Sequence, residues 1–177
     1  MKLVVGLGNP GEKYEYTRHN AGFLILNAFV AKKVGDGIVW LSETKFNAHV
    51  YREEGVIYAK PQTFMNRVGE SVSKLVHFYN IDLSNLLVIH DDVDLIKGEF
   101  KLKKGSQAAG HHGVEDIFSK LGTSDFFRLR MGVGRPLDKK YEVEDYVLEK
   151  FSDEEISNLK DLFEKKIYDK IDGFLNL

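Results

Sequence analysis

Two short, largely apolar runs constrain the fold of this chain more than any other feature of its sequence. The first spans residues 2–7 and becomes rich in glycine, and the second spans residues 86–89 and leads directly into His90 and Asp91. Apolar runs of this length, without polar alternation, are typical of strands that are covered on both faces. The sequence therefore predicts a sheet with buried strands at its centre.

Segments with other patterns separate and follow these two runs. Apolar residues at helical spacing predict helices, and alternating residues predict strands, two of which form a hairpin around a Glu-Glu-Gly turn. The expected helices cover residues 20–34, 68–79, 114–121 and most of 142–171, and the further strands cover residues 46–52, 56–60, 100–103 and 127–133. Strands interleaved with helices predict one α/β domain over residues 1–177, with a mixed, twisted central sheet flanked by helices on both faces.

Length and composition exclude several classes of protein. A chain of 177 residues buries roughly 70% of its unfolded surface, so it needs no covalent cross-links to be stable. It has no cysteine, which excludes disulfides, thiolate zinc sites and cysteine nucleophiles. The longest apolar stretch, residues 21–31, is shorter than the roughly 20 residues of a membrane span. The N-terminal residues lack the pattern of a signal peptide, so we expect a cytoplasmic protein without a membrane partner.

Charge is unevenly distributed along the chain. Residues 97–140 contain 10 basic and 5 acidic residues, whereas residues 141–177 contain 5 basic and 11 acidic residues. A positive central segment beside an acidic tail fits a polyanion bound over one local patch. An ordinary solvated surface explains the same charges equally well.

A glycine motif follows the first apolar run. Residues 6–11 read Gly-Leu-Gly-Asn-Pro-Gly and formally match the G-x-G-x-x-G pattern of dinucleotide sites. In such sites a helix begins within the motif, but here Pro10 and Gly11 predict a turn, and the next helix begins near Asn20. No acidic residue stands at the expected ribose position, so we reject a nicotinamide site. The motif instead predicts a loop at a strand end that presents Asn9.

Two other segments carry candidate functional groups. Asp91 and Asp94 follow the second apolar run, and with His111 and His112 they offer ligands for a metal such as magnesium or zinc. The spacing of a known metal motif is missing, and the carboxylates can equally orient a base or cap a turn. Residues 60–66 lead from a strand into a helix, where we expect Thr63 as the helix N-cap. The same turn can present backbone N–H groups and an asparagine amide to a substrate carbonyl.

In their order along the chain, these motifs match one family. The chain closely resembles bacterial peptidyl-tRNA hydrolase. The matching motifs are residues 6–11, 17–22, 60–66, 91–95, 110–113 and 128–136.

This resemblance implies a monomeric α/β hydrolase that cleaves the ester between a peptide and the terminal ribose of tRNA, without a metal or organic cofactor. It assigns the catalytic histidine to His19 and its carboxylate partner to Asp91. A neutral imidazole can accept a proton from water near pH 7, and a carboxylate on the other ring nitrogen fixes its tautomer. An activated ester needs no covalent intermediate, which fits a chain without cysteine or a G-x-S-x-G motif.

The resemblance also implies a substrate-binding surface that recognises the acceptor stem and 3′ end of peptidyl-tRNA. Asn9 is expected to act in catalysis and to separate blocked from unblocked aminoacyl-tRNA. Aromatic residues are expected to stack on the 3′ end, and basic residues to contact acceptor-stem phosphates. Strand alternation places Lys101 with Lys103 on one face and Arg128 with Arg130 on another. The expected substrate and tRNA contacts are Tyr14, Phe64, Met65, Asn66, Lys103, His112 and Arg130.

One position departs from the family pattern in a way that affects chemistry. His112 stands where the family usually has an asparagine beside the catalytic site, and an imidazole can become charged. We therefore hypothesise an activity that is more sensitive to acid than is usual for the family. Val68, which replaces the usual serine, is expected only to pack.

Three alternatives stay open. A relative that binds RNA without catalysis is one, and intact His19, Asp91, Asn9 and Asn66 argue against it. A metal-dependent phosphoesterase that uses Asp91, Asp94 and His111 is another. A domain that only mediates protein contacts is the third, and it leaves the amides and imidazoles at the strand ends unexplained.

Overall fold

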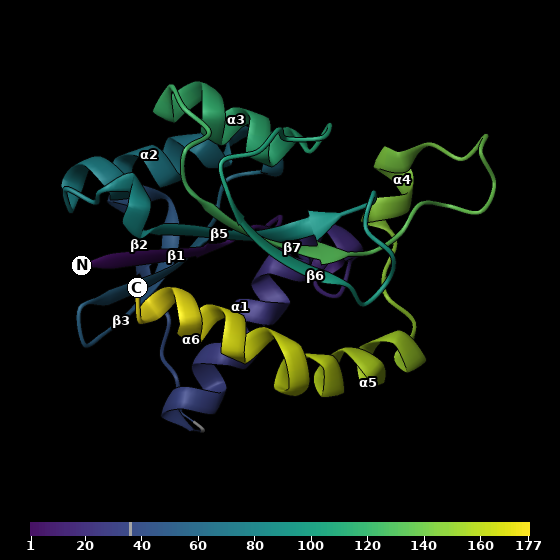
Figure 1. Ribbon diagram of the computed structural model, residues 1–177, viewed down its shortest axis with the longest axis horizontal. Coiled ribbons are helices and arrows are strands. Elements are labelled where there is room, and N and C mark those ends of the chain that lie inside the picture. The colour runs from purple at the N-terminus through teal and green to yellow at the C-terminus, as the bar shows by residue number, and fades with distance from the viewer. Residues whose placement is uncertain (36) are drawn as a thin grey trace.

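A seven-stranded sheet forms the centre of the computed structural model, which describes residues 1–35 and 37–177. Its strand order is β2-β3-β4-β1-β5-β7-β6 (Figure 1). The strands are β1 (Lys2–Gly6), β2 (Leu41–Glu43), β3 (Ala48–Glu53), β4 (Val56–Pro61), β5 (Leu86–Asp92), β6 (Phe100–Lys104) and β7 (Phe127–Gly132).

The sheet is mixed, as predicted. β1 pairs in parallel with β4 on one side and with β5 on the other, and β7 pairs in parallel with β5. The predicted hairpin of β3 and β4 is antiparallel, and so are the edge pairs β2–β3 and β6–β7. The two apolar runs are therefore adjacent central strands, and β5 continues through His90, Asp91 and Asp92 instead of ending before them.

Helices cover both faces of the sheet. α2 and α3 lie on one face, and α1, α5 and α6 lie on the other (Figure 1). The helical tail is confirmed but divided, because α4 is separate and one π-helical turn, Phe163–Ile167, joins α5 to α6. The helices are α1 (Ala21–Val34), α2 (Val68–Phe78), α3 (His112–Leu121), α4 (Val143–Leu148), α5 (Asp153–Leu162) and α6 (Tyr168–Leu175). Within the described ranges, none of these is both long and apolar enough to cross a membrane.

Each face of the sheet has its own apolar core. Successive side chains of a strand point to opposite faces, so Leu3 and Val5 pack towards α2 and α3, whereas Val4 packs towards α1 and α6. All three side chains are fully buried. Burial on both faces explains why β1 and β5 read as continuous apolar runs in the sequence.

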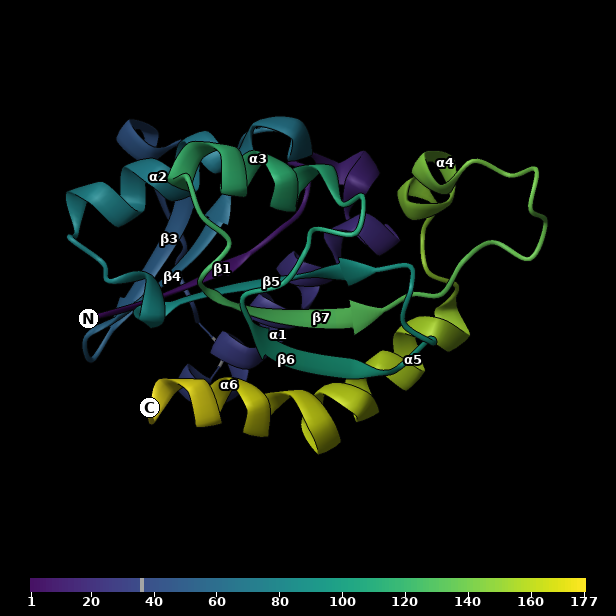
Figure 2. The same ribbon diagram turned by 45° about the horizontal axis from the view of Figure 1, so that its top comes forward.

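Close packing of α1 against β1 brings the segment before α1 to the end of the central strands. A Cβ atom on Gly22 would lie 2.3 Å from both the Leu7 nitrogen and the Ile89 oxygen. Only glycine fits there. The carboxyl ends of β1, β5 and β7 point to the same edge of the sheet, and α4 lies beside that edge (Figure 2). Candidate site residues gather at this edge, as expected for an α/β sheet.

Candidate active site

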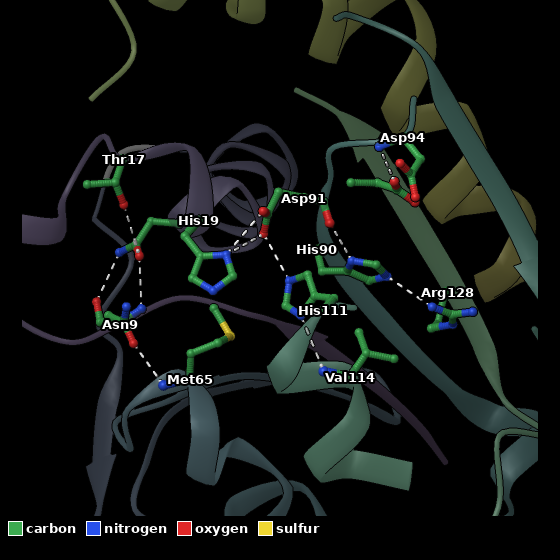
Figure 3. Close-up of polar contacts among 12 residues, drawn as sticks. Asn9, Thr17, His19, Met65, His90, Asp91, Asp94, His111, Val114 and Arg128 are labelled. Atoms are coloured by element: carbon green, nitrogen blue, oxygen red, sulfur yellow. Dashed lines mark hydrogen bonds and ion pairs between the residues drawn. The ribbon is translucent and has the colours of Figure 1, made fainter. Parts of the chain in front are cut away.

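Two histidines meet one buried carboxylate at this edge of the sheet. Asp91 lies near the end of β5, His19 lies in a 3₁₀ turn directly before α1, and His111 is the N-cap residue of α3. His19 Nδ1 lies 3.0 and 3.1 Å from the two carboxylate oxygens of Asp91, and His111 Nε2 lies 3.0 Å from Oδ1 (Figure 3). Both imidazoles therefore share the same carboxylate.

The surrounding contacts define where the protons of this cluster lie. The Val114 backbone N–H donates to His111 Nδ1 at 3.3 Å, so the proton of a neutral His111 is on Nε2 and is donated to Asp91. His19 likewise donates from Nδ1, which leaves its Nε2 turned away from Asp91 (Figure 3). Burial alone would raise the pKa of Asp91, but His19 and His111 outweigh it and hold that pKa well below its usual range. Asp91 is therefore an anion.

A third histidine, which is buried, supports Asp91 from its own strand. His90 is 1% exposed, and its Nδ1 donates to the Asp91 carbonyl oxygen at 2.6 Å. Burial, together with the nearby His111 and Arg128, holds the pKa of His90 well below its ordinary value. His90 is therefore neutral, and its Nε2 can accept from Arg128, whose guanidinium lies 3.4 Å away.

Asn9 is held in one orientation. The Asn20 side chain accepts from the Asn9 backbone N–H at 2.8 Å and donates to the Asn9 carbonyl at 2.9 Å. The Asn9 side-chain oxygen in turn accepts from the Met65 backbone N–H at 2.8 Å. This contact assigns oxygen and nitrogen in the amide, because only the oxygen can accept. Asn9 therefore has its NH₂ group left for a substrate, and its acceptor is already used.

These groups line a cavity of about 990 Å³. His19, Asp91 and Asn9 lie in its lining together with residues 64–67, 108–112 and 141–144. A cavity of this size accommodates an organic group of small-molecule size rather than a single water or ion.

Four of the other predicted contacts, Phe64, Met65, Asn66 and His112, line the cavity, whereas Tyr14, Lys103 and Arg130 are not among its lining residues. Phe64 is 55% exposed, and its ring meets Tyr14 edge to face with 6.3 Å between the centroids. Met65 is buried and Asn66 is exposed, and both line the cavity. Thr63 does not cap a helix, because the N-cap of α2 is Arg67 and carries no side-chain cap, so that prediction is wrong.

The predicted arrangement of the basic residues is wrong in one respect. In the antiparallel pair of β6 and β7, Lys101 lies opposite Arg130 and Lys103 lies opposite Arg128. Opposed residues of an antiparallel pair share a face, so all four side chains lie on the same face of the sheet. Lys103 is exposed, Arg130 pairs with Asp92 at 3.1 Å, and Arg128 is only 1% exposed.

His112 lies at the mouth of the cavity, where it connects two helices. Its Nε2 lies 3.1 Å from a carboxylate oxygen of Glu144 in α4, and its Nδ1 lies 3.3 Å from Glu115 in α3. Hydrogen bonds that His112 donates to Glu144, and then to Glu115, raise the pKa of His112. The residue that departs from the family pattern therefore links the α3 side of the cavity to the α4 side.

The candidate metal ligands do not come together as the sequence suggested. Asp94 pairs with Arg135 at 2.6 Å, and His112 pairs with two glutamates. Within the described ranges, the group with metal-binding geometry is His19, Asp91 and His111. These three are already joined by hydrogen bonds, which an ion would have to replace.

Sequence reasoning missed three supporting residues of the site. His111 was considered only as a metal ligand, and neither His90 nor Asn20 was given a role. The signal for His111 was its place in the Gly-His-His-Gly motif, directly before an expected helix. The role of Asn20 depends on how the loop after β1 folds back on the turn before α1, and the role of His90 depends on Arg128, 38 positions away, so no local pattern reveals either.

Comparison with known proteins identifies the family of the chain. The peptidyl-tRNA hydrolase family matches the chain over residues 3–175. A peptidyl-tRNA hydrolase of Mycoplasma capricolum subsp. capricolum is 42% identical over 170 residues, which cover 94% of this chain and 89% of that protein. One of Lawsonia intracellularis is 43% identical over 178 residues, which cover 98% and 86%. The crystal structure of peptidyl-tRNA hydrolase from Acinetobacter baumannii superposes with a TM-score of 0.80 at 35% identity, covering 99% of this chain and 93% of that one.

The match extends over nearly the whole chain, and the similar structure has the same α/β fold. This match supports the identification of the chain as an enzyme that hydrolyses peptidyl-tRNA. This chain belongs to the peptidyl-tRNA hydrolase family.

Proposed function

We propose that this chain cleaves the ester of peptidyl-tRNA by direct attack of a water molecule that His19 activates. One observation carries the proposal: His19 donates to the buried Asp91 anion at 3.0 Å and keeps its other ring nitrogen available beside a large cavity. A neutral imidazole with this tautomer is a general base at neutral pH.

In the first step, His19 Nε2 accepts a proton from water while the water oxygen bonds to the ester carbonyl carbon. The imidazolium that forms is stabilised by the Asp91 anion 3.0 Å away. Negative charge develops on the carbonyl oxygen, and the NH₂ groups of Asn9 and Asn66 are the candidate donors to it. The fixed orientation of Asn9 means that its donor need not reorganise as the charge develops.

In the second step, the tetrahedral intermediate collapses and the bond from carbon to the ribose oxygen breaks. His19 returns its proton to that oxygen, so peptide acid and free tRNA leave and the imidazole is again neutral. No protein nucleophile is needed, because the ribose oxygen of an aminoacyl ester is a good leaving group. His111 acts through Asp91, which it holds by its Nε2–H.

Selectivity for blocked substrates follows from Asn9. Its free donor can hydrogen-bond an acylated nitrogen's carbonyl, but it faces the charged ammonium of an unblocked aminoacyl group with like partial charge. Recognition of tRNA is proposed to use Tyr14 and Phe64 for the 3′ end and Lys103 and Arg130 for acceptor-stem phosphates. The enzyme is proposed to act in the cytoplasm as a monomer.

Hydrolysis of N-acetyl-aminoacyl-tRNA and of unblocked aminoacyl-tRNA, each with and without EDTA, tests this proposal. We expect selective cleavage of the blocked ester at the same rate in EDTA, and a loss of about 10²- to 10⁴-fold in kcat for His19→Asn and Asp91→Asn. Loss of activity in EDTA would instead favour a metal at His19, Asp91 and His111. Tight tRNA binding without cleavage would contradict catalysis.

A further inference from the structure

Arg128 is a buried guanidinium that the proposed mechanism does not use. It lies in β7 on the face covered by α2 and α3, and it is 1% exposed. No carboxylate within the described ranges lies at ion-pair distance from it, and its Nε has no hydrogen-bond partner there. Burial lowers its pKa to about 10, which leaves it charged at neutral pH. A buried, unpaired charge is costly, so packing alone would favour an apolar side chain.

The hydrogen-bond acceptors of one terminal nitrogen of this guanidinium belong to the loop that leads to the active site. One terminal nitrogen donates to the carbonyl oxygens of Ser106 and Gln107, at 2.8 and 2.9 Å, and to the Ser106 hydroxyl. The other contacts His90 Nε2 at 3.4 Å (Figure 3). The guanidinium thus connects this loop with the residue next to Asp91.

The loop between β6 and α3, residues 105–111, leads into the cavity: residues 108–111 line it, and Ser106 and Gln107 directly precede them. Gly105, Ala109 and Gly110 have positive φ angles of 56°, 52° and 79°. Glycine adopts such angles at little cost in free energy, but alanine does so only with strain. The loop conformation therefore needs support from outside the loop. Among the described residues, the backbone hydrogen bonds of this loop lie at its ends: Gly105 N–H donates to Phe126, His111 N–H donates to Ala108, and the His111 carbonyl accepts from Val114 and Glu115. Between them, its carbonyls accept from Arg128.

We propose that Arg128 is a positioning residue: it holds the loop of residues 105–111, whose second half lines the cavity, and through this loop and His90 it fixes His111 and Asp91 for His19. This inference rests on the proposed function. An arginine suits the task because its planar fork donates to several acceptors in fixed directions, which an ammonium group does not do. Its direct action is therefore on the protein backbone rather than on RNA phosphates.

Arg128→Met and Arg128→Lys test the inference. We expect Arg128→Met to fold and to lose about 10- to 100-fold in kcat with a smaller change in KM, because small displacements of catalytic groups are costly. Arg128→Lys is expected to recover part of kcat. Arg52→Met is the control. Arg52 lies on β3 and bonds to Glu43 of β2 and to Tyr79 after α2, none of which lines the cavity, so this variant should keep both parameters.

Backbone hydrogen exchange of residues 105–111 measures how readily the loop opens, and it needs no substrate. It therefore separates this inference from the proposed function. Faster exchange in Arg128→Met supports positioning even if the natural protein proves inactive on peptidyl-tRNA. Unchanged exchange with natural kcat would overturn the inference. A rise in KM alone, with a weaker salt dependence, would also overturn it, because Arg128 would then be a phosphate contact. Loss of folding in both variants would count against it, since Arg128 would then serve the fold as a whole.

Discussion

Protonated His112 is expected to hold the two sides of the cavity mouth together through Glu144 and Glu115, contacts that we call the brace, and so to slow the enzyme in acid. The imidazole joins Glu144 in α4 to Glu115 in α3, at 3.1 and 3.3 Å. Both helix ends border the cavity, so the substrate has to pass the groups that this contact holds together. The brace exists in full only when His112 carries its positive charge.

The direction of the pH effect follows from the raised pKa of His112. Its hydrogen bonds to Glu144 and Glu115 favour the charged form in the folded protein. A histidine whose pKa is raised in the folded protein contributes to stability in full below its ordinary pKa of about 6.5. That contribution disappears as the pH rises through the raised pKa. The brace is therefore strongest on the acid side and is absent in alkaline solution.

The magnitude is limited by exposure. The side chains of His112 and Glu144 are 59% and 79% exposed, so water and salt screen their attraction. Exposed ion pairs contribute about 0.2–1 kcal/mol each, and the two contacts share one charge, so about 1 kcal/mol is the upper limit. That free energy changes the ratio of open to braced cavity by roughly fivefold.

Profiles of kcat/KM against pH measure the effect in the natural protein, His112→Asn and Glu144→Gln. At low salt we expect both variants to exceed the natural protein by up to about fivefold in acid and to equal it in alkaline solution. High salt should remove the difference. Coincident profiles for all three proteins would refute the reasoning. A change in His112→Asn alone would show that His112 acts on the substrate and not through Glu144.

Three further predictions concern the substrate contact, the packing and the tRNA surface. Asn9→Asp keeps an acceptor for Met65 but loses the donor, so the ratio of cleavage rates for blocked and unblocked aminoacyl-tRNA should fall. Gly22→Ala places a Cβ against backbone atoms of β1 and β5, and urea unfolding should show a loss of about 1–3 kcal/mol. Lys103→Met should leave kcat unchanged and reduce the slope of log Kd against log salt by about 0.7–0.9, as expected for one lost phosphate contact.

Much of the fold was predictable because burial leaves a pattern in the sequence. β1 and β5 are covered on both faces and therefore read as apolar runs, and α2 has one apolar stripe. β2 leaves no such pattern, because it has three residues at the edge of the sheet and two of them are exposed. The π-helical turn, Phe163–Ile167, was also unpredictable, since tertiary packing determines where a helix widens.

The candidate site was predictable where the motif itself carries the chemistry. His19 and Asp91 lie 72 positions apart. The resemblance implies that they pair, and the structure places His19 Nδ1 3.0 Å from an Asp91 carboxylate oxygen. The use of the Asn9 oxygen by Met65 was not predictable, because it depends on how the turn after β4 approaches the loop after β1. Residue types alone thus identify the groups, whereas the fold determines which atoms remain free to react.

Arg128 shows most clearly why local alternation is insufficient. Alternation along β7 predicts correctly that Arg128 and Arg130 share a face, and a charged face is ordinarily exposed. The groups that cover that face differ along the strand. Phe118 of α3 and the loop after β6 enclose Arg128, and its guanidinium lies 5.4 Å from the Phe118 ring centre. Lys103, directly opposite on the edge strand, stays exposed. Two basic residues in one cross-strand pair therefore face different surroundings: Arg128 faces the loop after β6, and Lys103 faces the solvent.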